Sequence, residues 1–206
     1  MAKQTPSILT KLTEARTSQE YAMMSRDSIA WLKRKVAQIR QPSSIGRGIK
    51  GETERHRIVQ KFLKGGLYFF FYGPKGKADL PYYDTFPLVL VLERYSDGFL
   101  GLNLHYLPIK QRILILSKLI AYGAIYDEND ELKRIRITYD ILQSTKRFKE
   151  FRPCLKRYLY SNIKSKLLAV QPDEWDVAVM LPAHQFKKEK APVVWEESMQ
   201  DIKEHS

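Results

Sequence analysis

Basic side chains and aromatic rings alternate closely between residues 148 and 166 of this chain. Lysine and arginine neutralise phosphate groups, and aromatic rings stack on nucleic-acid bases, so the combination is typical of proteins that bind single strands. A solvated helix face whose rings belong to the core explains the same pattern equally well. The candidate contacts for nucleic acid are Lys149, Arg152, Lys156, Arg157 and Lys164.

The sequence offers no comparable set of residues for catalysis or metal binding. The histidines are scattered, and none stands three or four residues from another, whereas metal sites usually draw several ligands from short spacings. Nucleotide-binding loops and nucleophile motifs are absent from the sequence. We therefore expect that the protein is not an enzyme and needs neither cofactor nor metal. The histidines are His56, His105, His184 and His205.

The single cysteine and the acidic residues of the middle segment have simpler explanations than chemistry. If Pro153 begins a helix, the helix dipole and the basic neighbours would lower the pKa of Cys154. The simpler expectation, which we favour, is a small residue packed under that helix. Asp79 and Asp97 stand in turn-forming sequence, where a carboxylate usually bonds the local backbone.

The positive charge of the 206-residue chain, +12 overall, is distributed unevenly. Residues 1–64 hold 14 Lys and Arg against 5 acids, and residues 143–168 hold 8 against 1, whereas residues 169–206 hold 4 against 8. Such a balance suits nucleic acid, anionic lipid or an acidic protein surface. No apolar run approaches the ~20 residues of a membrane span, and no signal peptide is evident, so we expect a soluble protein.

Apolar periodicity predicts both strands and helices. Strands are expected at "LYFFFY" (67–72) and "FPLVLVLER" (86–94), and "FLGLNLHYL" (99–107) should complete a hairpin through "SDG". On that last strand, Gly101, Asn103 and His105 form a small, polar face away from the core. Helices are expected at residues 17–40, after Pro108 and after Pro153, and a last strand is expected at residues 174–182.

This order of elements predicts an α+β fold. A small antiparallel sheet or an SH3-like barrel should carry flanking helices and an extended basic N-terminal arm. We expect an arm with an amphipathic helix at residues 1–50, an α+β core at 51–184 and a charged C-terminal tail at 185–206. The "LPYYD" stretch at residues 80–84 is not explained by burial, because consecutive tyrosines on a strand point to opposite sides.

Two family resemblances accompany these patterns. "LPYYDTFPLVLVLERYSDGFLGLNLHYLP", the segment from "FKEFRPC" to "AHQFKK", "VVWEES" and the "WLKRKV" helix resemble a family of small proteins from contractile-tailed bacteriophages. That resemblance implies a phage context and a structural role, with no catalytic residues to carry over. The layout of "LYFFFYGPKGKADLPYYDTFPLVLVLE" also resembles the SH3-like barrels of toxin endoribonucleases, although Phe86 stands where that family commonly has arginine.

Three functions follow from these observations. The leading hypothesis is a structural protein of the tail, baseplate or neck of a phage particle, found in the virion and, during assembly, in the host cytoplasm. It would dock on acidic surfaces of other virion proteins in a multi-subunit assembly. The interface residues expected for this role are Trp31, Lys33, Arg34, Tyr82, Tyr83 and Trp195.

The second hypothesis is a basic protein that binds phage DNA during replication or packaging through the cationic set of residues 149–164. The third and weakest is a ribonuclease that acts through a residue near Lys75, Lys77 or Asp84.

Overall fold

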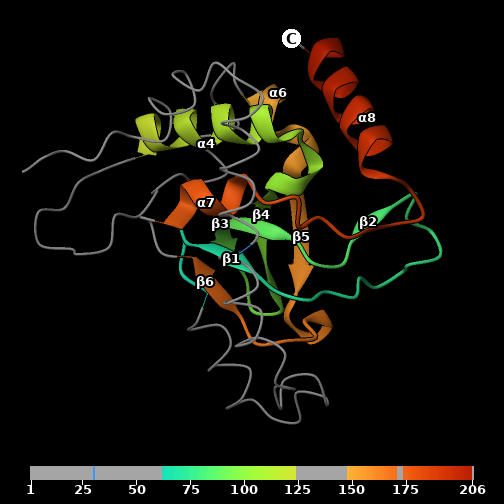
Figure 1. The fold of residues 1–206 in the computed structure, drawn as a ribbon. Helices are drawn as coiled ribbons and strands as arrows, with labels where there is room; N and C mark the ends of the chain where they lie inside the picture. Colours follow the sequence, from blue (N-terminus) through green and yellow to red (C-terminus); the bar gives the residue numbers. More distant parts are fainter. Residues whose placement is uncertain (1–29, 31–61, 124–147, 171–173, 206) are drawn as a thin grey trace, which may run out of the picture.

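A five-stranded antiparallel sheet forms the centre of the molecule (Figure 1). The computed structural model describes residue 30 and residues 62–123, 148–170 and 174–205, and the statements below concern these residues. The strands lie in the order β5-β4-β3-β1-β6, and each neighbouring pair is antiparallel. Their bounds are β1 (Leu67–Phe69), β3 (Leu88–Arg94), β4 (Gly98–Asn103), β5 (Leu155–Leu159) and β6 (Leu168–Val170).

A second sheet pairs β2 (Tyr83–Asp84) with β7 (Phe186–Lys187). The helices are α4 (Ile109–Gly123), α6 (Phe148–Phe151), α7 (Trp175–Val179) and α8 (Ala191–Glu204), and the 3-10 turns are η2 (Leu104–Tyr106), η3 (Arg152–Cys154) and η4 (Tyr160–Asn162). The predicted α+β fold, with an antiparallel sheet and flanking helices, is confirmed. The barrel alternative is wrong, because β5 and β6 remain at opposite edges of an open sheet.

The β3–β4 hairpin forms as predicted and lies in the middle of the sheet. Leu88, Leu90 and Leu92 point to one face and Val89 and Val91 to the other, and all five side chains are buried. A strand covered on both faces needs a continuous apolar run rather than an alternating one. The register shifts between Val91 and Glu93, where a bulge interrupts the ladder.

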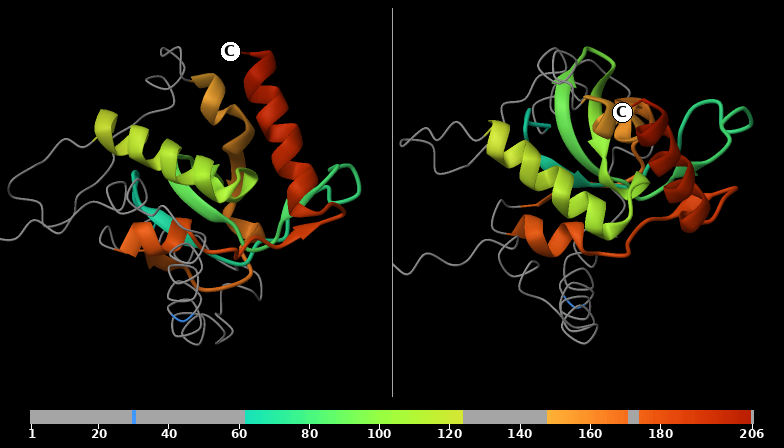
Figure 2. Two further views of the ribbon diagram at one scale, coloured as in Figure 1. Left: turned by 45° about the horizontal axis from the view of Figure 1, so that its top comes forward. Right: turned by 90° about the horizontal axis from the view of Figure 1, so that it is seen from above.

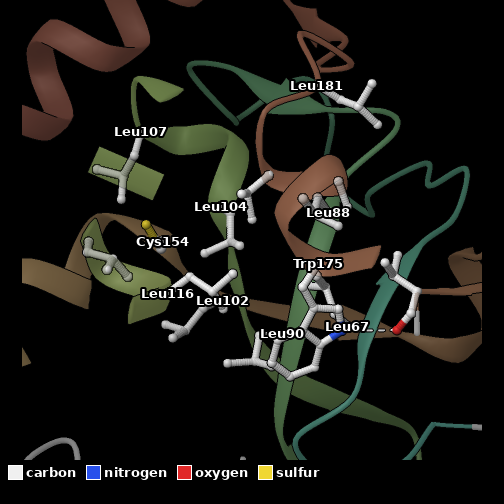
Figure 3. Close-up of a cluster of buried hydrophobic side chains, with 14 of the residues drawn as sticks. Leu67, Leu88, Leu90, Leu102, Leu104, Leu107, Leu116, Cys154, Trp175 and Leu181 are labelled. Atoms are coloured by element: carbon white, nitrogen blue, oxygen red, sulfur yellow. Dashed lines mark hydrogen bonds between the residues drawn. The ribbon is translucent and has the colours of Figure 1, made fainter. Parts of the chain in front are cut away.

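Helices cover the leucine face of the sheet. Side chains from α4, α7 and α8 join the same apolar cluster as the leucines of β3, and Figure 2 shows α7 running beside α4. Within this cluster the Trp175 ring packs near Leu67 and Leu90, and its Nε1 donates a hydrogen bond to the Val170 carbonyl at 3.0 Å (Figure 3). The opposite face carries an aromatic cluster that includes Phe70, Phe99 and Tyr158.

The segment after Pro153 is a strand, not the predicted helix. The spacing of Leu155 and Leu159 suits a helix but also suits a strand, since four residues are two full strand periods. The glycines of β4 decide the outcome, because a β-carbon at Gly98 would lie 2.0 Å from the Tyr158 carbonyl oxygen. The missing side chain lets β5 pair at the edge that β4 would otherwise expose.

Two further predictions about the C-terminal third differ from the structure. Residues 175–179 form helix α7 rather than a strand, since Trp175, Ala178 and Val179 share one buried helix face. Residues 185–206, expected to be a charged tail, include β7 and α8, in which Val194 is fully buried. The tail is therefore part of the fold, because its few apolar residues recur at helical spacing.

The polar face predicted for β4 also differs. Asn103 and His105 are buried rather than placed away from the core, because Asp84 supplies them with a polar partner.

The predicted N-terminal arm and helix, with Trp31, Lys33 and Arg34, lie outside the described residues. Among the described residues, no helix has both the length and the hydropathy required to cross a membrane.

Candidate nucleic-acid interface

A cavity of about 380 Å³ opens between η3, β5, α8 and the loop before β2. It is a small cavity, near the lower end of the ~300–1,000 Å³ that small-ligand sites span. Its walls combine two cations, two carboxylates and two tyrosine rings. The lining residues are Tyr82, Tyr106, Arg152, Pro153, Lys156, Glu197, Ser198 and Asp201.

Arg152 and Lys156 form the basic wall of this cavity. Pro153 sits in the first turn of η3, and the chain then enters β5, so the two cations come from consecutive elements at one edge of the sheet. The Arg152 side chain is 48% exposed, and its Nε lies 3.8 Å from the Asp201 carboxylate. Because both side chains are partly exposed to solvent, an ion pair at this distance holds the guanidinium only weakly.

Lys156 is held against an aromatic ring. Its Nζ lies 4.3 Å from the centre of the Tyr106 ring, within the range of a cation–π interaction. Burial lowers the pKa of this ammonium, and the Asp201 carboxylate opposes the shift. The cation–π contact with Tyr106 keeps the Lys156 ammonium at the cavity wall rather than in bulk solvent.

The opposite wall is acidic and belongs to α8. Glu197 and Asp201 stand one helical turn apart, and both line the cavity. Burial raises the pKa of the Tyr82 hydroxyl, and its hydrogen bond to Glu197 adds to the shift. Asp201 Oδ1 also lies 3.2 Å from the Nδ1 of His205. The cavity therefore carries charges of both signs, a mixture that phosphate binding alone does not explain.

The tyrosines of the cavity belong to an aromatic group beneath it. The ring centres of Tyr82 and Tyr106 lie 5.9 Å apart, and Phe186 packs edge-on against Tyr106 at 5.3 Å. Tyr106 is buried, whereas Tyr82 is half-buried and is the more accessible of the two rings. Tyr82 is therefore the ring best placed to stack on a planar ligand.

The structure separates the remaining cationic candidates from this cavity. Arg157 follows Lys156 on β5 and so points to the opposite side of the strand, where it pairs with Asp97 and lies over the Tyr95 ring at 4.2 Å. Lys164 is exposed in the loop before β6, where its side chain passes close to Gly73. Lys149 lies in α6, and its side chain is outside the described part of the chain.

Two of the aromatic interface candidates make contacts within the chain. Tyr83 lies in β2, opposite Lys187 of β7, and is half-buried. Trp195 of α8 donates a hydrogen bond from Nε1 to the His105 carbonyl at 2.9 Å and packs against the His184 ring at 5.1 Å. Trp195 therefore fixes α8 to the core, and whether it also contacts another protein stays a prediction.

A buried polar cluster, which sequence reasoning missed, lies beneath Trp195: Asp84, His105 and Arg112 are buried, and His184 at its margin is half-buried. Asp84 accepts hydrogen bonds from His105 Nδ1 at 2.7 Å and from the backbone amides of Phe86 and Gln185 at 3.0 Å each. These groups come from β2, η2, α4 and the loop before β7. Because the other three residues are 21 residues or more from Asp84 in the sequence, no local motif indicates the cluster.

Burial sets the protonation state of this cluster. It lowers the pKa of Arg112 to about 10 and that of His184 to about 4, and it also lowers the pKa of His105. His105 and the amides hold the pKa of Asp84 below its usual range despite burial. Both imidazoles are therefore neutral at pH 7, beside an ionised carboxylate and a charged guanidinium.

This arrangement bears on two chemical candidates from the sequence. Asp84 is buried under backbone amides, so the structure does not bring it to the surface with Lys75 and Lys77, which are exposed in the turn at residues 75–79. Cys154 is fully buried, and burial raises the pKa of its thiol to about 12, so it is packed as expected, although the helix expected after Pro153 does not form. In the described part of the chain no three His, Cys, Asp or Glu side chains gather as a metal site.

One comparison with known proteins identifies a family. The family model described as the phage T4 terminal DNA protecting protein matches residues 12–198. No curated protein and no solved structure matches the chain. The resemblance to a bacteriophage protein family is thereby confirmed. The hypothesis of a structural component of the tail, baseplate or neck is wrong, because the matched family is described by its action on DNA ends.

Proposed function

Because the chain belongs to the family of the phage T4 terminal DNA protecting protein, we propose that it binds the ends of phage DNA and shields them from degrading enzymes. The cavity lined by Arg152, Lys156 and Tyr82 is the observation from which we assign DNA-end binding to particular residues. Cations and an accessible ring at one small site match the phosphate and the exposed base of a DNA terminus. The family thus supports the hypothesis of a protein that binds phage DNA.

Protection requires occupancy rather than catalysis. A protein bound over the terminal nucleotides denies a nuclease the phosphodiester it must reach, and no bond has to be made or broken. We therefore keep the expectation that the protein is not an enzyme. Charge-assisted contacts from Arg152 and Lys156 to phosphate oxygens would contribute the attraction, and the basic residues outside the described part would add to it.

The place of action follows from the same proposal. Phage DNA ends meet host nucleases in the host cytoplasm, so the protein would act there. A place in the virion and an origin in a contractile-tailed phage are separate predictions. Mass spectrometry of purified particles would test the first, and neither is needed for end binding.

The test is protection of a linear duplex from an exonuclease. We expect wild-type protein to slow the loss of a linear duplex, and R152Q/K156Q to protect at least about tenfold less well at equal concentration, since hydrogen bonds to charged groups contribute about 1.5–3 kcal/mol each. The control K64Q/K110Q removes the same formal charge from exposed lysines that do not line the cavity. It should protect like wild type.

Two results would contradict the proposal. If wild-type protein leaves the linear duplex as sensitive as naked DNA, end protection is wrong. If both double variants lose protection equally, general basicity accounts for the effect and the cavity has no special part. Thermal unfolding of each variant would verify that the proteins compared are folded.

A further inference from the structure

The acidic wall is the feature of the cavity that DNA-end binding leaves unexplained. Glu197 and Asp201 face the same space as Arg152 and Lys156. The side of a DNA duplex presents phosphates at every step, and carboxylates repel phosphates. A site selected only for phosphate would therefore not be expected to keep two carboxylates beside its two cations.

The carboxylates are held in place by the packing of α8. Val194 and Ser198 of this helix are buried, and Trp195 ties it to the His105 carbonyl. Because the helix is fixed at these points, the backbone of Glu197 and Asp201 stays at the cavity, and both side chains line it. Asp201 is paired with Arg152 and His205, and Glu197 bonds the Tyr82 hydroxyl, so a ligand has to compete with these contacts or use the carboxylate oxygens that they leave.

An unpaired base supplies hydrogen-bond donors that carboxylate oxygens can accept. Guanine, adenine and cytosine carry exocyclic amino groups that donate hydrogen bonds, whereas thymine has no amino group and donates only from its ring N3–H. In a paired stretch one hydrogen of each amino group is engaged with the opposite strand, whereas a frayed or overhanging terminal nucleotide frees the whole pairing edge. Carboxylates accept hydrogen bonds from such amino groups, as Asp and Glu do with cytosine in the major groove.

We infer that the cavity receives one unpaired terminal nucleotide, whose phosphate contacts Arg152 and Lys156 and whose base donates to Glu197 and Asp201. The base stacks on Tyr82, the accessible ring of the cavity. The two carboxylates then determine specificity: they reject continuous duplex by repulsion and accept an end by hydrogen bonding. This inference rests on the proposed function and adds the chemical basis by which an end differs from an interior.

The experiment compares DNA hairpins that differ only at the terminus. The probes are a dumbbell closed at both ends, a blunt hairpin, and hairpins with one unpaired guanine or one unpaired thymine, each titrated by fluorescence anisotropy. The proteins are wild type, E197Q/D201N and E196Q/E204Q. The last variant removes the same charge from the same helix at exposed positions outside the cavity.

We expect wild type to bind the guanine-ended hairpin about tenfold or more tightly than the dumbbell, and the thymine-ended hairpin less tightly than the guanine-ended one. E197Q/D201N should bind the dumbbell more tightly and lose most of both preferences, because removal of the carboxylate charges relieves their repulsion of phosphate. E196Q/E204Q should keep both preferences. If the double variant does not fold, E197Q alone gives the same comparison, since this side chain is exposed.

The possible failures are distinguishable. Equal binding of the dumbbell and the ended probes by wild type would refute end binding itself, and with it the proposed function. A wild-type preference for ends that survives unchanged in E197Q/D201N would refute the role of the carboxylates and leave end binding standing. Equal changes in the two acidic variants would also refute it, because net charge would then explain the effect.

Discussion

His184 links the buried polar cluster to the helix that walls the cavity. Its ring lies 5.1 Å from Trp195 of α8 and 6.1 Å from His105, and the charges near it are those of Arg112 and Asp84. Burial and the neighbouring cation hold it neutral. Protonation of this single residue would place a second positive charge beside Arg112, under the point where α8 is attached.

The cluster therefore predicts how stability depends on pH. The pKa of His184 is about 4 in the folded protein and about 6.5 in an unfolded chain, so between these values the unfolded state binds more protons. The free energy of unfolding should fall as pH drops from about 6.5 to 4. The lowered pKa of His105 acts in the same direction, and the loss from Asp84 follows only below about pH 3.9.

Urea unfolding at pH 7 and pH 4.5 measures this effect. We expect H184Q to lose less stability than wild type between the two values, because glutamine does not titrate. An equal loss in both proteins would show that His184 does not carry the dependence.

At the scale of elements, the pairing of β4 with β5 is the step that forms the basic wall. β5 brings Lys156 to Tyr106, and it can pair only because Gly98 has no side chain where the Tyr158 carbonyl approaches. Gly101 allows a similar approach on β4, since a β-carbon there would meet Val89 Cγ1 at 2.4 Å. Gly98 and Gly101 thus let β4 lie close to β5 on one side and to β3 on the other.

Substitution of Gly98 by alanine tests this dependence. A methyl group 2.0 Å from a backbone oxygen requires β5 to move away. We expect G98A to destabilise the protein by about 1–3 kcal/mol, the usual cost of overpacking. The matched control is G73A, where a β-carbon meets only the ends of Lys77 and Lys164 at 3.5 Å. Thermal unfolding should show a lower midpoint for G98A alone, and equal midpoints would contradict the argument.

At the scale of the whole molecule, charge of one sign dominates while the cavity carries both. The net charge of +12 favours nucleic acid as a partner, and under our proposal the acidic wall would restrict which part of the DNA enters the cavity. In this proposal the basic residues of the whole chain attract DNA over long range, and the carboxylates of the cavity select the DNA end. Salt screens the first strongly and the second less, because the cavity is partly shielded from solvent.

The salt dependence of binding separates the two contributions. For a duplex probe, the logarithm of the association constant should fall linearly with the logarithm of salt concentration, by about 0.9 per phosphate contact. We expect R152Q/K156Q to reduce the slope by up to about 1.8, and K64Q/K110Q to reduce it by less. Anisotropy titrations of the blunt hairpin between 50 and 200 mM salt measure the slopes. An unchanged slope in R152Q/K156Q would mean that neither residue contacts phosphate.

The parts of this protein that the sequence determined are those governed by neighbours along the chain. The continuous apolar run, the "SDG" turn and the helical spacing after Pro108 specified the β3–β4 hairpin and helix α4, because period and turn chemistry act over a few residues. The composition likewise indicated nucleic acid among the possible partners and identified Arg152 and Lys156 as candidate contacts. It could not choose among partners, since lysine and arginine suit any acidic surface.

Only the tertiary structure decided which of these residues form one site. Leu155 and Leu159 fit a helix as well as a strand, and the choice depended on Gly98, more than fifty residues earlier. Asp201 meets Arg152 across 49 residues, and Asp84 meets His105 across 21 residues. Contacts of this kind depend on how whole elements pack, and no local pattern of residue types encodes them.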